Sequence, residues 1–154
     1  MRIDMVVAGY LVHEGKVLLI KHRKLGKWLP VGGHIEKDEI PDDALKREFK
    51  EEVNLRIEII DSMKNLQVDS DVRQLKNPFH VNVHNVGDHE HCCLFYICRT
   101  ADSNSLKMNR DELLDFRWLS GQEIDEIYEK EDMPSDVRSI AKLALEAAGQ
   151  EDDV

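Results

Sequence analysis

The order of the expected secondary-structure elements predicts an α/β fold, in which a mixed β-sheet lies between helices. Two apolar runs typical of a hairpin come first, an amphipathic helix follows, and further strands and a terminal helix complete the chain. A chain of 154 residues can bury one substantial hydrophobic core. We therefore expect a single domain at residues 1–149 and a frayed acidic tail at residues 150–154.

The first expected element is a β-hairpin. Residues 3–12 are apolar and partly β-branched, the Glu14-Gly15 pair is a turn signal, and residues 16–20 resume the apolar run. Farther along, the glycine pair Gly32-Gly33 predicts a second turn. Trp28, a few residues before these glycines, is interpreted as a core residue.

An amphipathic helix is expected at residues 41–53. Pro41 suits its first turn, where the missing backbone N–H is not needed. With a period of 3.6 residues, Leu45, Phe49 and Val53 fall on one face of this helix. That face can pack into the core, and it leaves the neighbouring face free for another role.

The neighbouring face carries three carboxylates, Glu48, Glu51 and Glu52, at spacings of three and four residues. Like charges four residues apart cost a helix about 0.2–0.5 kcal/mol per pair, so the pattern does not serve helix stability. Converging carboxylate oxygens suit Mg²⁺ or Mn²⁺. Arg47 can hold Glu51, four residues later, through a charge-assisted hydrogen bond. The alternative is a solvated acidic face.

The spacing of these residues resembles the signature of the Nudix hydrolases. In that signature a glycine is followed by a glutamate, then by an Arg-Glu pair, a Glu-Glu pair, a glycine and an apolar residue. The matching residues here are Gly33, Glu39, Arg47, Glu48, Phe49, Glu51, Glu52 and Leu55. Asn54 stands where the family has the second glycine, and asparagine also tolerates a left-handed backbone at a helix end.

The resemblance implies a Nudix-like α/β/α sandwich with a mixed sheet, and a short strand at residues 28–31 that leads to the glycines. It also implies a pyrophosphohydrolase that depends on Mg²⁺, with Mn²⁺ as a substitute. Such an enzyme cleaves the diphosphate linkage of a nucleoside diphosphate joined to another moiety, as in a nucleoside triphosphate or a nucleotide sugar. The expected partner is therefore a small-molecule nucleotide substrate.

The same resemblance implies roles for individual residues. The implied metal ligands are the carbonyl oxygen of Gly33 and the carboxylates of Glu48, Glu51 and Glu52. Glu48 serves either as a ligand or as the catalytic base, because family members differ on this point. Arg47 is expected to orient the carboxylates, and Glu39 to brace the loop and the helix.

Two other segments are candidates for substrate contacts. The basic residues within 21–27 form either a solvated loop or a lip that meets the substrate's phosphates through Arg23 and Lys27. Family members also place an acidic residue, as a ligand or as the base, in a loop before a later strand that ends in tryptophan. Asp111 and Glu112 are the candidates here, with Glu112 preferred, and a solvated helix start is the alternative.

Further strands are expected at residues 55–60, 79–86 and 92–98, with a loop that has room for one short strand at residues 61–77. In the segment 79–86, apolar and polar residues alternate strictly. This alternation predicts that Val81 and Val83 lie on the buried face of a half-buried strand.

Histidines and cysteines cluster in this region, at His80, His84, His89, His91, Cys92 and Cys93. Three interpretations stay open, namely a substrate pocket lined by His80 and His84, a zinc site, and ordinary surface placement. The spacing matches none of the paired patterns of structural zinc sites. Cys92 and Cys93 should also point to opposite faces of a strand, so they cannot easily bind one ion together.

Two helices are expected at the C-terminal end of the chain. A short one covers residues 121–128, and a longer one covers residues 135–148, opened by Pro134-Ser135 and closed by Gly149. The apolar residues of the longer helix form one stripe. We therefore expect this helix to cover a face of the sheet.

Charge and composition limit the functions that the chain can perform. A net charge of −10 and a pI near 5.1 argue against broad nucleic-acid binding, although a bound divalent metal keeps phosphate ligands compatible with this charge. No run approaches membrane-spanning length, so no membrane association is expected. Three cysteines without a signal peptide indicate reduced thiols and a cytoplasmic location.

Two rival functions stay open at this point. One is a Nudix-like module that binds a nucleotide without cleaving it, and the intact set of glutamates argues against this alternative. The other is a zinc-binding protein that uses the cluster between His80 and His91. The oligomeric state is also open, although homodimers are common among the proteins that the chain resembles.

Overall fold

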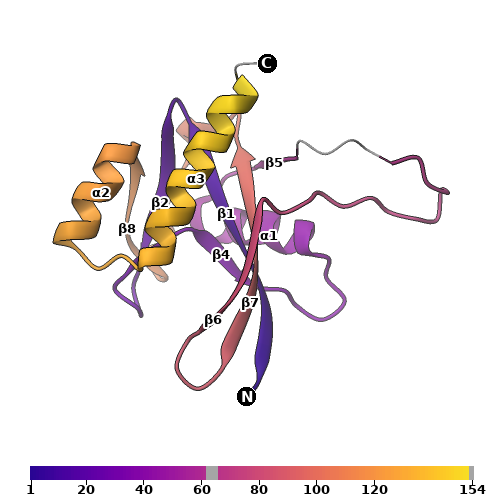
Figure 1. Ribbon diagram of the computed structural model, residues 1–154, viewed down its shortest axis with the longest axis horizontal. Helices are drawn as coiled ribbons and strands as arrows, with labels where there is room; N and C mark the ends of the chain where they lie inside the picture. Colours follow the sequence, from indigo (N-terminus) through magenta and orange to yellow (C-terminus); the bar gives the residue numbers. More distant parts are fainter. Residues whose placement is uncertain (62–65, 153–154) are drawn as a thin grey trace.

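The structure is a computed structural model that describes residues 1–61 and 66–152. Its strands form one connected sheet, and helices cover both faces of that sheet (Figure 1). In chain order the strands are β1 (Ile3–His13), β2 (Lys16–His22), β3 (Trp28–Leu29), β4 (Val31–His34), β5 (Glu58–Ile60), β6 (His80–Asn85), β7 (Glu90–Arg99) and β8 (Leu113–Leu119). The helices are α1 (Pro41–Val53), α2 (Gly121–Lys130) and α3 (Ser135–Asp152), with a short 3₁₀ turn at Ser103–Ser105.

Strand β1 connects the sheet, because it pairs with three other strands. Along one edge it pairs in parallel with β7, and along the other edge it pairs in antiparallel fashion with β4 and then with β2. The β1–β2 pair is the hairpin that the Glu14-Gly15 signal predicts. β8 joins the sheet through β2, and β5 and β6 join it through β7. The predicted mixed sheet is therefore confirmed.

The first hydrophobic core lies between the sheet and α1. Leu45, Phe49 and Val53 are completely buried there, as their spacing predicts. They belong to one cluster with Val7 and Leu11 of β1. Burial of side chains of this size contributes about 1.5–3 kcal/mol each, which holds the helix against the sheet. Helix α1 packs on β1 and β4, so its acidic face comes next to the glycines of β4.

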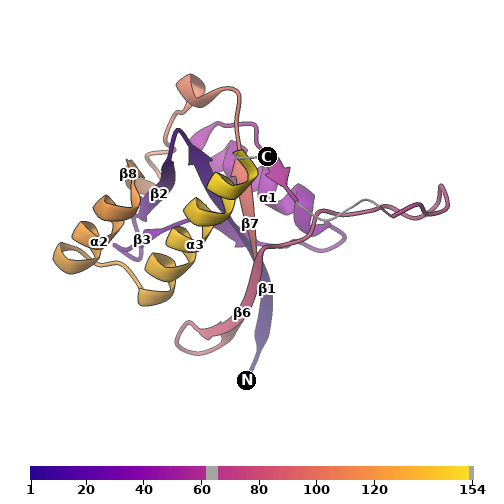
Figure 2. The ribbon, with the colours of Figure 1, turned by 45° about the horizontal axis from the view of Figure 1, so that its top comes forward.

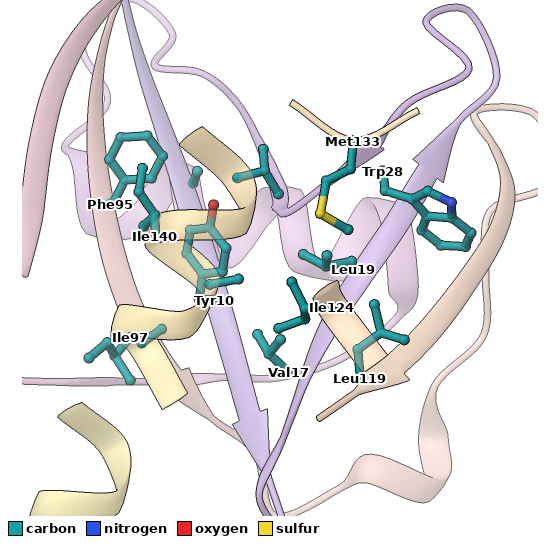
Figure 3. Close-up of a cluster of buried hydrophobic side chains, with 14 of the residues drawn as sticks. Tyr10, Val17, Leu19, Trp28, Phe95, Ile97, Leu119, Ile124, Met133 and Ile140 are labelled. Carbon is teal, nitrogen blue, oxygen red and sulfur yellow. The ribbon is translucent and has the colours of Figure 1, made fainter. Parts of the chain in front are cut away.

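A second core lies on the opposite face, under α3 and α2 (Figure 3). Tyr10 and Phe95 reach it from the sheet and Ile140 reaches it from α3. Trp28 is completely buried in this core, as predicted, and its Nε1–H donates to Glu131 Oε1 at 3.1 Å. With α1 on one face of the sheet and α3 on the other, the predicted α/β/α sandwich is confirmed.

Helix α1 begins and ends at the predicted residues, and Asn54 forms its C-terminal cap. The backbone of Asn54 is left-handed, with φ 58° and ψ 34°. Its side chain accepts a hydrogen bond from Lys50 Nζ at 2.9 Å and donates one to the carbonyl oxygen of Ser105 at 3.2 Å. Asparagine thus provides the conformation that glycine usually provides at this position.

Gly32 and Gly33 do not form the predicted turn, because both lie inside strand β4 and neither has a positive φ. A Cβ atom at Gly32 would overlap the carbonyl oxygen of Val7 in β1. A Cβ atom at Gly33 would overlap the carboxylate of Glu48 in α1. Glycine is required here because the neighbouring strand and helix approach too closely for a side chain.

The chain between α1 and β6 is less regular than predicted. β5 begins at Glu58 rather than at Leu55, because Leu55 is buried in the first core directly after α1. Of the loop predicted at residues 61–77, residues 62–65 lie outside the described residues. The described part, residues 66–77, contains no strand and extends away from the sheet in both views (Figures 1 and 2).

The prediction that Val81 and Val83 are buried is wrong. Their exposed fractions are 54% and 52%, whereas His80, Asn82 and His84 on the other face of β6 are partly buried. The β6–β7 hairpin runs past the helices that cover the sheet (Figure 1), so the valine face stays exposed. Alternation identified the two faces of the strand, but the neighbouring helices decide which face is covered.

Both C-terminal helices continue past their predicted ends. α2 extends to Lys130 instead of Tyr128, and α3 continues through Gly149 to Asp152. A single glycine costs a helix only about 1 kcal/mol, so it does not force the helix to end. The predicted tail therefore begins inside α3, and residues 153–154 lie outside the described residues. Among the described helices, none combines the length and apolar character needed to cross a membrane.

Replacing Gly32 by alanine should lower the free energy of unfolding by about 1–3 kcal/mol, because the added methyl group overlaps the Val7 carbonyl oxygen. The matched control is Gly149→Ala, where nothing lies within 4 Å of the added Cβ atom. There the same change should raise the free energy of unfolding by up to about 1 kcal/mol, since alanine favours a helix. Urea unfolding measures both, and equal stability of Gly32→Ala and the parent would contradict the close approach of β1 and β4.

Candidate active site

Arg47, in the middle of α1, is the centre of an ion-pair network that reaches the loop before the helix. Its guanidinium binds both carboxylate oxygens of Glu39, at 2.9 and 3.0 Å, and Glu48 Oε1 at 2.8 Å. It also donates to the carbonyl oxygen of His34 at 3.0 Å. These Arg47 bonds, followed by a bond from the backbone N–H of Glu36, lower the pKa of Glu39 to about 2. Glu39 therefore ties the loop before α1 to the helix itself.

Glu51 lies at the edge of this network. Its Oε2 is 3.4 Å from Arg47 Nη1, and its side chain is 52% exposed. The predicted contact between Arg47 and Glu51 is therefore present, but it is longer than the bonds to Glu39 and Glu48. The reason is that the loop before α1 places Glu39 against the forked donors of the guanidinium.

Glu48 and Glu52 form a close pair of carboxyl groups one helical turn apart, joined by a hydrogen bond. Among the charged side chains of the described residues, that of Glu52 is the one that is buried, with an exposed fraction of 4%. Burial raises the pKa of Glu48. Burial, then the charge of Glu48 and then that of Glu112, raises the pKa of Glu52 well above its usual range. Without a cation, the pair therefore holds a proton at neutral pH.

One oxygen of this pair has an unusual environment. Glu52 Oε2 is buried and has no hydrogen-bond partner among the described residues. A buried polar atom without a partner costs free energy, and more so when the group is charged. The atoms around it that could bind a metal ion are carboxylate oxygens, and the backbone of Gly33 lies against Glu48. An oxygen-only set with an unpaired buried oxygen fits Mg²⁺ or Mn²⁺.

The loop before β8 brings a further carboxylate to the pair. The backbone N–H groups of Lys107 and Asn109 donate to the carbonyl oxygens of Val53 and Glu52, at 2.9 and 2.8 Å. Glu112 follows in the same loop, is exposed, and contributes through its charge to the raised pKa of Glu52. The preferred candidate of the acidic loop therefore lies near enough for its charge to act on Glu52.

The basic turn between β2 and β3 is bound to this acidic loop. The backbone N–H of Arg23 donates to the Glu112 carbonyl oxygen at 2.9 Å. The guanidinium of Arg23 donates to the Arg110 carbonyl oxygen at 2.8 and 3.1 Å. Lys27 is exposed at the end of the same turn. Arg23 and Glu112, which are 89 positions apart by their numbers, thus lie at one end of the sheet.

A cavity of about 550 Å³ opens at the loop before β8. The same loop that is bonded to the end of α1 forms most of its wall, which explains its position. The lining residues are Leu106, Lys107, Met108, Asn109, Arg110, Asp111 and Phe116. The wall therefore combines apolar side chains with both signs of charge.

His80 and His84 are not brought to the carboxylates. Both lie on the sheet face that α3 covers, whereas Glu48 and Glu52 lie on the face that α1 covers. The ring centroid of His80 is 5.7 Å from that of Phe95, a residue of the second core. These two histidines are therefore separated from the carboxylates by the sheet.

Cys92 and Cys93 point to opposite faces of β7, as predicted for neighbouring residues of a strand. Cys93 is buried in the second core, where burial raises the pKa of its thiol to about 12. Cys92 is partly exposed, and both thiols, like that of Cys98, are free. The two neighbouring thiols therefore cannot bind one ion together.

Sequence reasoning missed two residues of the site. The backbone N–H of Asn109 binds the Glu52 carbonyl oxygen, and the carbonyl oxygen of His34 accepts a bond from Arg47. Both contacts use backbone groups. Every residue type has a backbone C=O group, and every residue type except proline has a backbone N–H group. No residue pattern could therefore have identified them, although the position of His34 directly after Gly33 could have drawn attention to it.

Comparisons with known proteins agree with this geometry. The family model for the NUDIX domain matches residues 4–143. A Nudix-family hydrolase from Clostridium perfringens has a TM-score of 0.78 at 26% identity, over 96% of this chain and 99% of that one. An Ap4A hydrolase from C. elegans shares the fold, with a TM-score of 0.67 at 16% identity, over 95% and 98% of the two chains.

A shorter match connects the chain to a MutT-like protein from Streptomyces ambofaciens. The two are 41% identical over 54 residues, which are 34% of this chain and 35% of that relative. This match thus spans about a third of the relative's length. The family match, in contrast, covers most of the chain and includes the whole segment from Gly33 to Leu55. The chain therefore belongs to the Nudix hydrolases, enzymes that act on phosphoanhydride bonds.

Proposed function

We propose that this protein hydrolyses the diphosphate linkage of a nucleoside diphosphate joined to another moiety, such as further phosphate or a sugar. Mg²⁺ is the proposed cofactor, and Mn²⁺ can replace it. The observation that carries the proposal is the buried Glu52 oxygen without a partner, held against Glu48 at the surface of β4. This environment is unfavourable for two carboxylates alone and favourable once a divalent cation binds them.

The metal would be held by the carboxylates of Glu48, Glu51 and Glu52 and by the carbonyl oxygen of Gly33. When bound, Mg²⁺ offsets the negative charge that develops on the phosphoryl oxygens during displacement. Arg47 acts as a positioning residue, because its bonds to Glu39 and Glu48 fix the direction of the carboxylates. The raised pKa of Glu52 means that metal binding releases a proton, so metal affinity should rise with pH.

Glu112 is the proposed base. It is exposed, it follows the cavity-lining residue Asp111 in the chain, and its charge raises the pKa of Glu52, whereas Glu48 is bonded to Arg47. The water oxygen attacks one phosphorus atom while Glu112 takes a proton from that water. The bond from this phosphorus to the bridging oxygen breaks, and the leaving phosphate departs with the bonding electrons.

The cavity at the loop before β8 is the proposed substrate site. Its volume of about 550 Å³ lies within the range of small-molecule pockets. Met108 and Phe116 offer apolar contacts for the nucleobase of the substrate. Arg23 and Lys27 are proposed to meet its phosphates from the neighbouring turn. We favour this site over a pocket at His80 and His84, which lie on the other side of the sheet. This pairing of apolar and basic groups supports the proposed substrate class.

Replacing Glu52 by glutamine should lower kcat by a factor on the order of 10²–10⁴, because the variant keeps the size of the side chain and removes its charge. The measurement is phosphate released from a panel of nucleoside triphosphates and nucleotide sugars with Mg²⁺ or Mn²⁺. Glu146→Gln is the matched control, since Glu146 is exposed on α3, the helix on the opposite face of the sheet. This control should turn over at the parental rate.

Two outcomes of this experiment would contradict the proposal. A Glu52→Gln protein as fast as the parent would show that the carboxylate is not needed. A parent protein that binds nucleotides tightly by titration calorimetry, yet releases no phosphate with Mn²⁺, would indicate a non-catalytic binding module instead.

The raised pKa of Glu52 also predicts how stability depends on pH. The folded state binds the Glu52 proton more tightly than the unfolded state, whose pKa is the usual value of 4.5. This contribution to stability is complete below pH 4.5 and is lost as the pH rises toward the raised pKa. Without metal, Glu52→Gln should therefore gain stability relative to the parent between pH 5 and pH 8. The gain is about 1.4 kcal/mol for each pH unit over which the folded parent keeps the Glu52 proton and the unfolded parent has released it.

Urea unfolding in EDTA at both pH values measures this difference. Addition of Mg²⁺ should reverse the order at pH 8, because only the parent gains the full set of ligands. A stability difference between the two proteins that is the same at pH 5 and pH 8 would show that the pKa of Glu52 is not raised.

Replacing Glu112 by glutamine should lower kcat by a factor on the order of 10²–10⁴ with little change in KM, because the lost group acts on the attacking water. Steady-state kinetics of the parent and the variant measure kcat and KM. A Glu112→Gln protein with the parental kcat would assign the base to another carboxylate, with Glu48 as the next candidate.

A further inference from the structure

A second cluster of ligand atoms lies on the sheet face opposite to the carboxylates. Asp4, His34, His89 and His91 each contribute one ligand atom, and these atoms all lie within 4.8 Å of one another. The register of the sheet explains the cluster. Asp4 is the partner of His91 in the parallel β1–β7 pair, and His34 is opposite Val6, two residues farther along the same face of β1.

Three of the six separations between these ligand atoms are close to those of a tetrahedral metal site. His34 Nε2 is 3.2 Å from Asp4 Oδ2, and His89 Nε2 is 3.4 Å from the same oxygen. His89 Nε2 is also 3.2 Å from His91 Nε2. Ligand atoms bound tetrahedrally at 2.0–2.1 Å from a zinc ion are about 3.3 Å apart. These three separations are therefore already close to the spacing that an ion requires, and the other three lie within 4.8 Å.

Outer contacts direct two of the ligand atoms toward the centre. Arg2 Nε donates to Asp4 Oδ1 at 3.0 Å, which leaves Asp4 Oδ2 for the cluster. Asp88 Oδ1 is 2.6 Å from His89 Nδ1, which favours a proton on Nδ1 and a lone pair on Nε2. Carboxylates that bind the remote nitrogen of a histidine ligand are a regular feature of metal sites. The cluster thus has ligands and supporting groups.

Three imidazole rings surround that of His91. The ring centroids of His34, His84 and His89 lie 5.1, 5.6 and 5.0 Å from that of His91. His84 contacts the ring of His91, but its Nδ1 is 3.0 Å from Asn82 Oδ1, and it does not belong to the four-atom group.

We propose that Asp4, His34, His89 and His91 form a binding site for a transition-metal ion, with Zn²⁺ as its occupant. Three imidazole nitrogens and one carboxylate oxygen suit Zn²⁺ and Co²⁺, whereas Mg²⁺ prefers oxygen ligands. Two of the four ligands, Asp4 and His34, lie far from the histidine-rich run in the sequence. The site is separate from the carboxylate site, since the sheet lies between them.

The role of this ion is structural. It joins the first residues of β1 and the β6–β7 hairpin to the last residue of β4. That last residue, His34, also binds Arg47 through its carbonyl oxygen at 3.0 Å. The ion therefore holds β4 at the residue that follows Gly33, and its loss should loosen the hairpin without removing any carboxylate.

Titration with Co²⁺ tests the proposal in the full chain. Protein stripped of metal with a chelator is titrated with Co²⁺ in excess Mg²⁺, which occupies oxygen sites. We expect one Co²⁺ per chain with the visible absorption of tetrahedral cobalt, which Zn²⁺ then displaces. His34→Ala and His91→Ala should abolish this spectrum and weaken Zn²⁺ binding by about tenfold or more. His84→Ala, a matched change beside His91, should keep both properties.

Thermal unfolding provides a second measurement. Zn²⁺ should raise the Tm of the parent, of His84→Ala and of Glu52→Gln, but not that of His34→Ala. The His34 side chain is 58% exposed, so the fold should tolerate its loss. Because Glu52→Gln retains this site, a failure of the proposed hydrolysis and a failure of zinc binding are distinguishable.

Three results would overturn the proposal. The first is an octahedral cobalt spectrum, or none, in the parent. The second is a tetrahedral spectrum that persists in His34→Ala, and the third is its loss in His84→Ala, which would mean that the ligands are different ones.

Discussion

The structure depends on a close approach of two carboxyl groups, Glu48 and Glu52, on the sheet-facing side of one helix. Buried like charges repel, and the protein offsets this repulsion with the guanidinium of Arg47 and with a proton that the pair retains. The apolar side chains of Leu45 and Phe49 anchor the helix on the sheet, so the carboxyl groups cannot separate. The arrangement is therefore poised to exchange its proton for a divalent cation.

Strand β4 carries this arrangement on one face and the histidine cluster on the other. Neighbouring residues of a strand point to opposite faces, so Gly33 admits the carboxylate of Glu48 while the side chain of His34 turns toward Asp4. The carbonyl oxygen of His34 in turn binds Arg47. Two clusters of different chemistry, one of carboxylates and one of three histidines with Asp4, thus lie against consecutive residues of β4.

Local features of the chain were predictable. Helix α1 begins at Pro41 and ends before Asn54 as expected, because caps and apolar periodicity act within a few residues. Predictions that depended on contacts between elements far apart in the sequence were less successful. Val81 is exposed because the hairpin runs past the helices, and Gly32 serves a close strand contact instead of a turn. Alternation and glycine content carry no information about which element lies opposite.

The sequence by itself determined the family, the fold class and the carboxylates, because their spacing on one helix is a local property. Only the tertiary structure decided which distant groups join them. Glu112 and Arg23 meet through backbone hydrogen bonds between two loops. Asp4 and His91 meet through the register of parallel strands. Such encounters depend on packing and register over the whole sheet, which no short stretch of residues specifies.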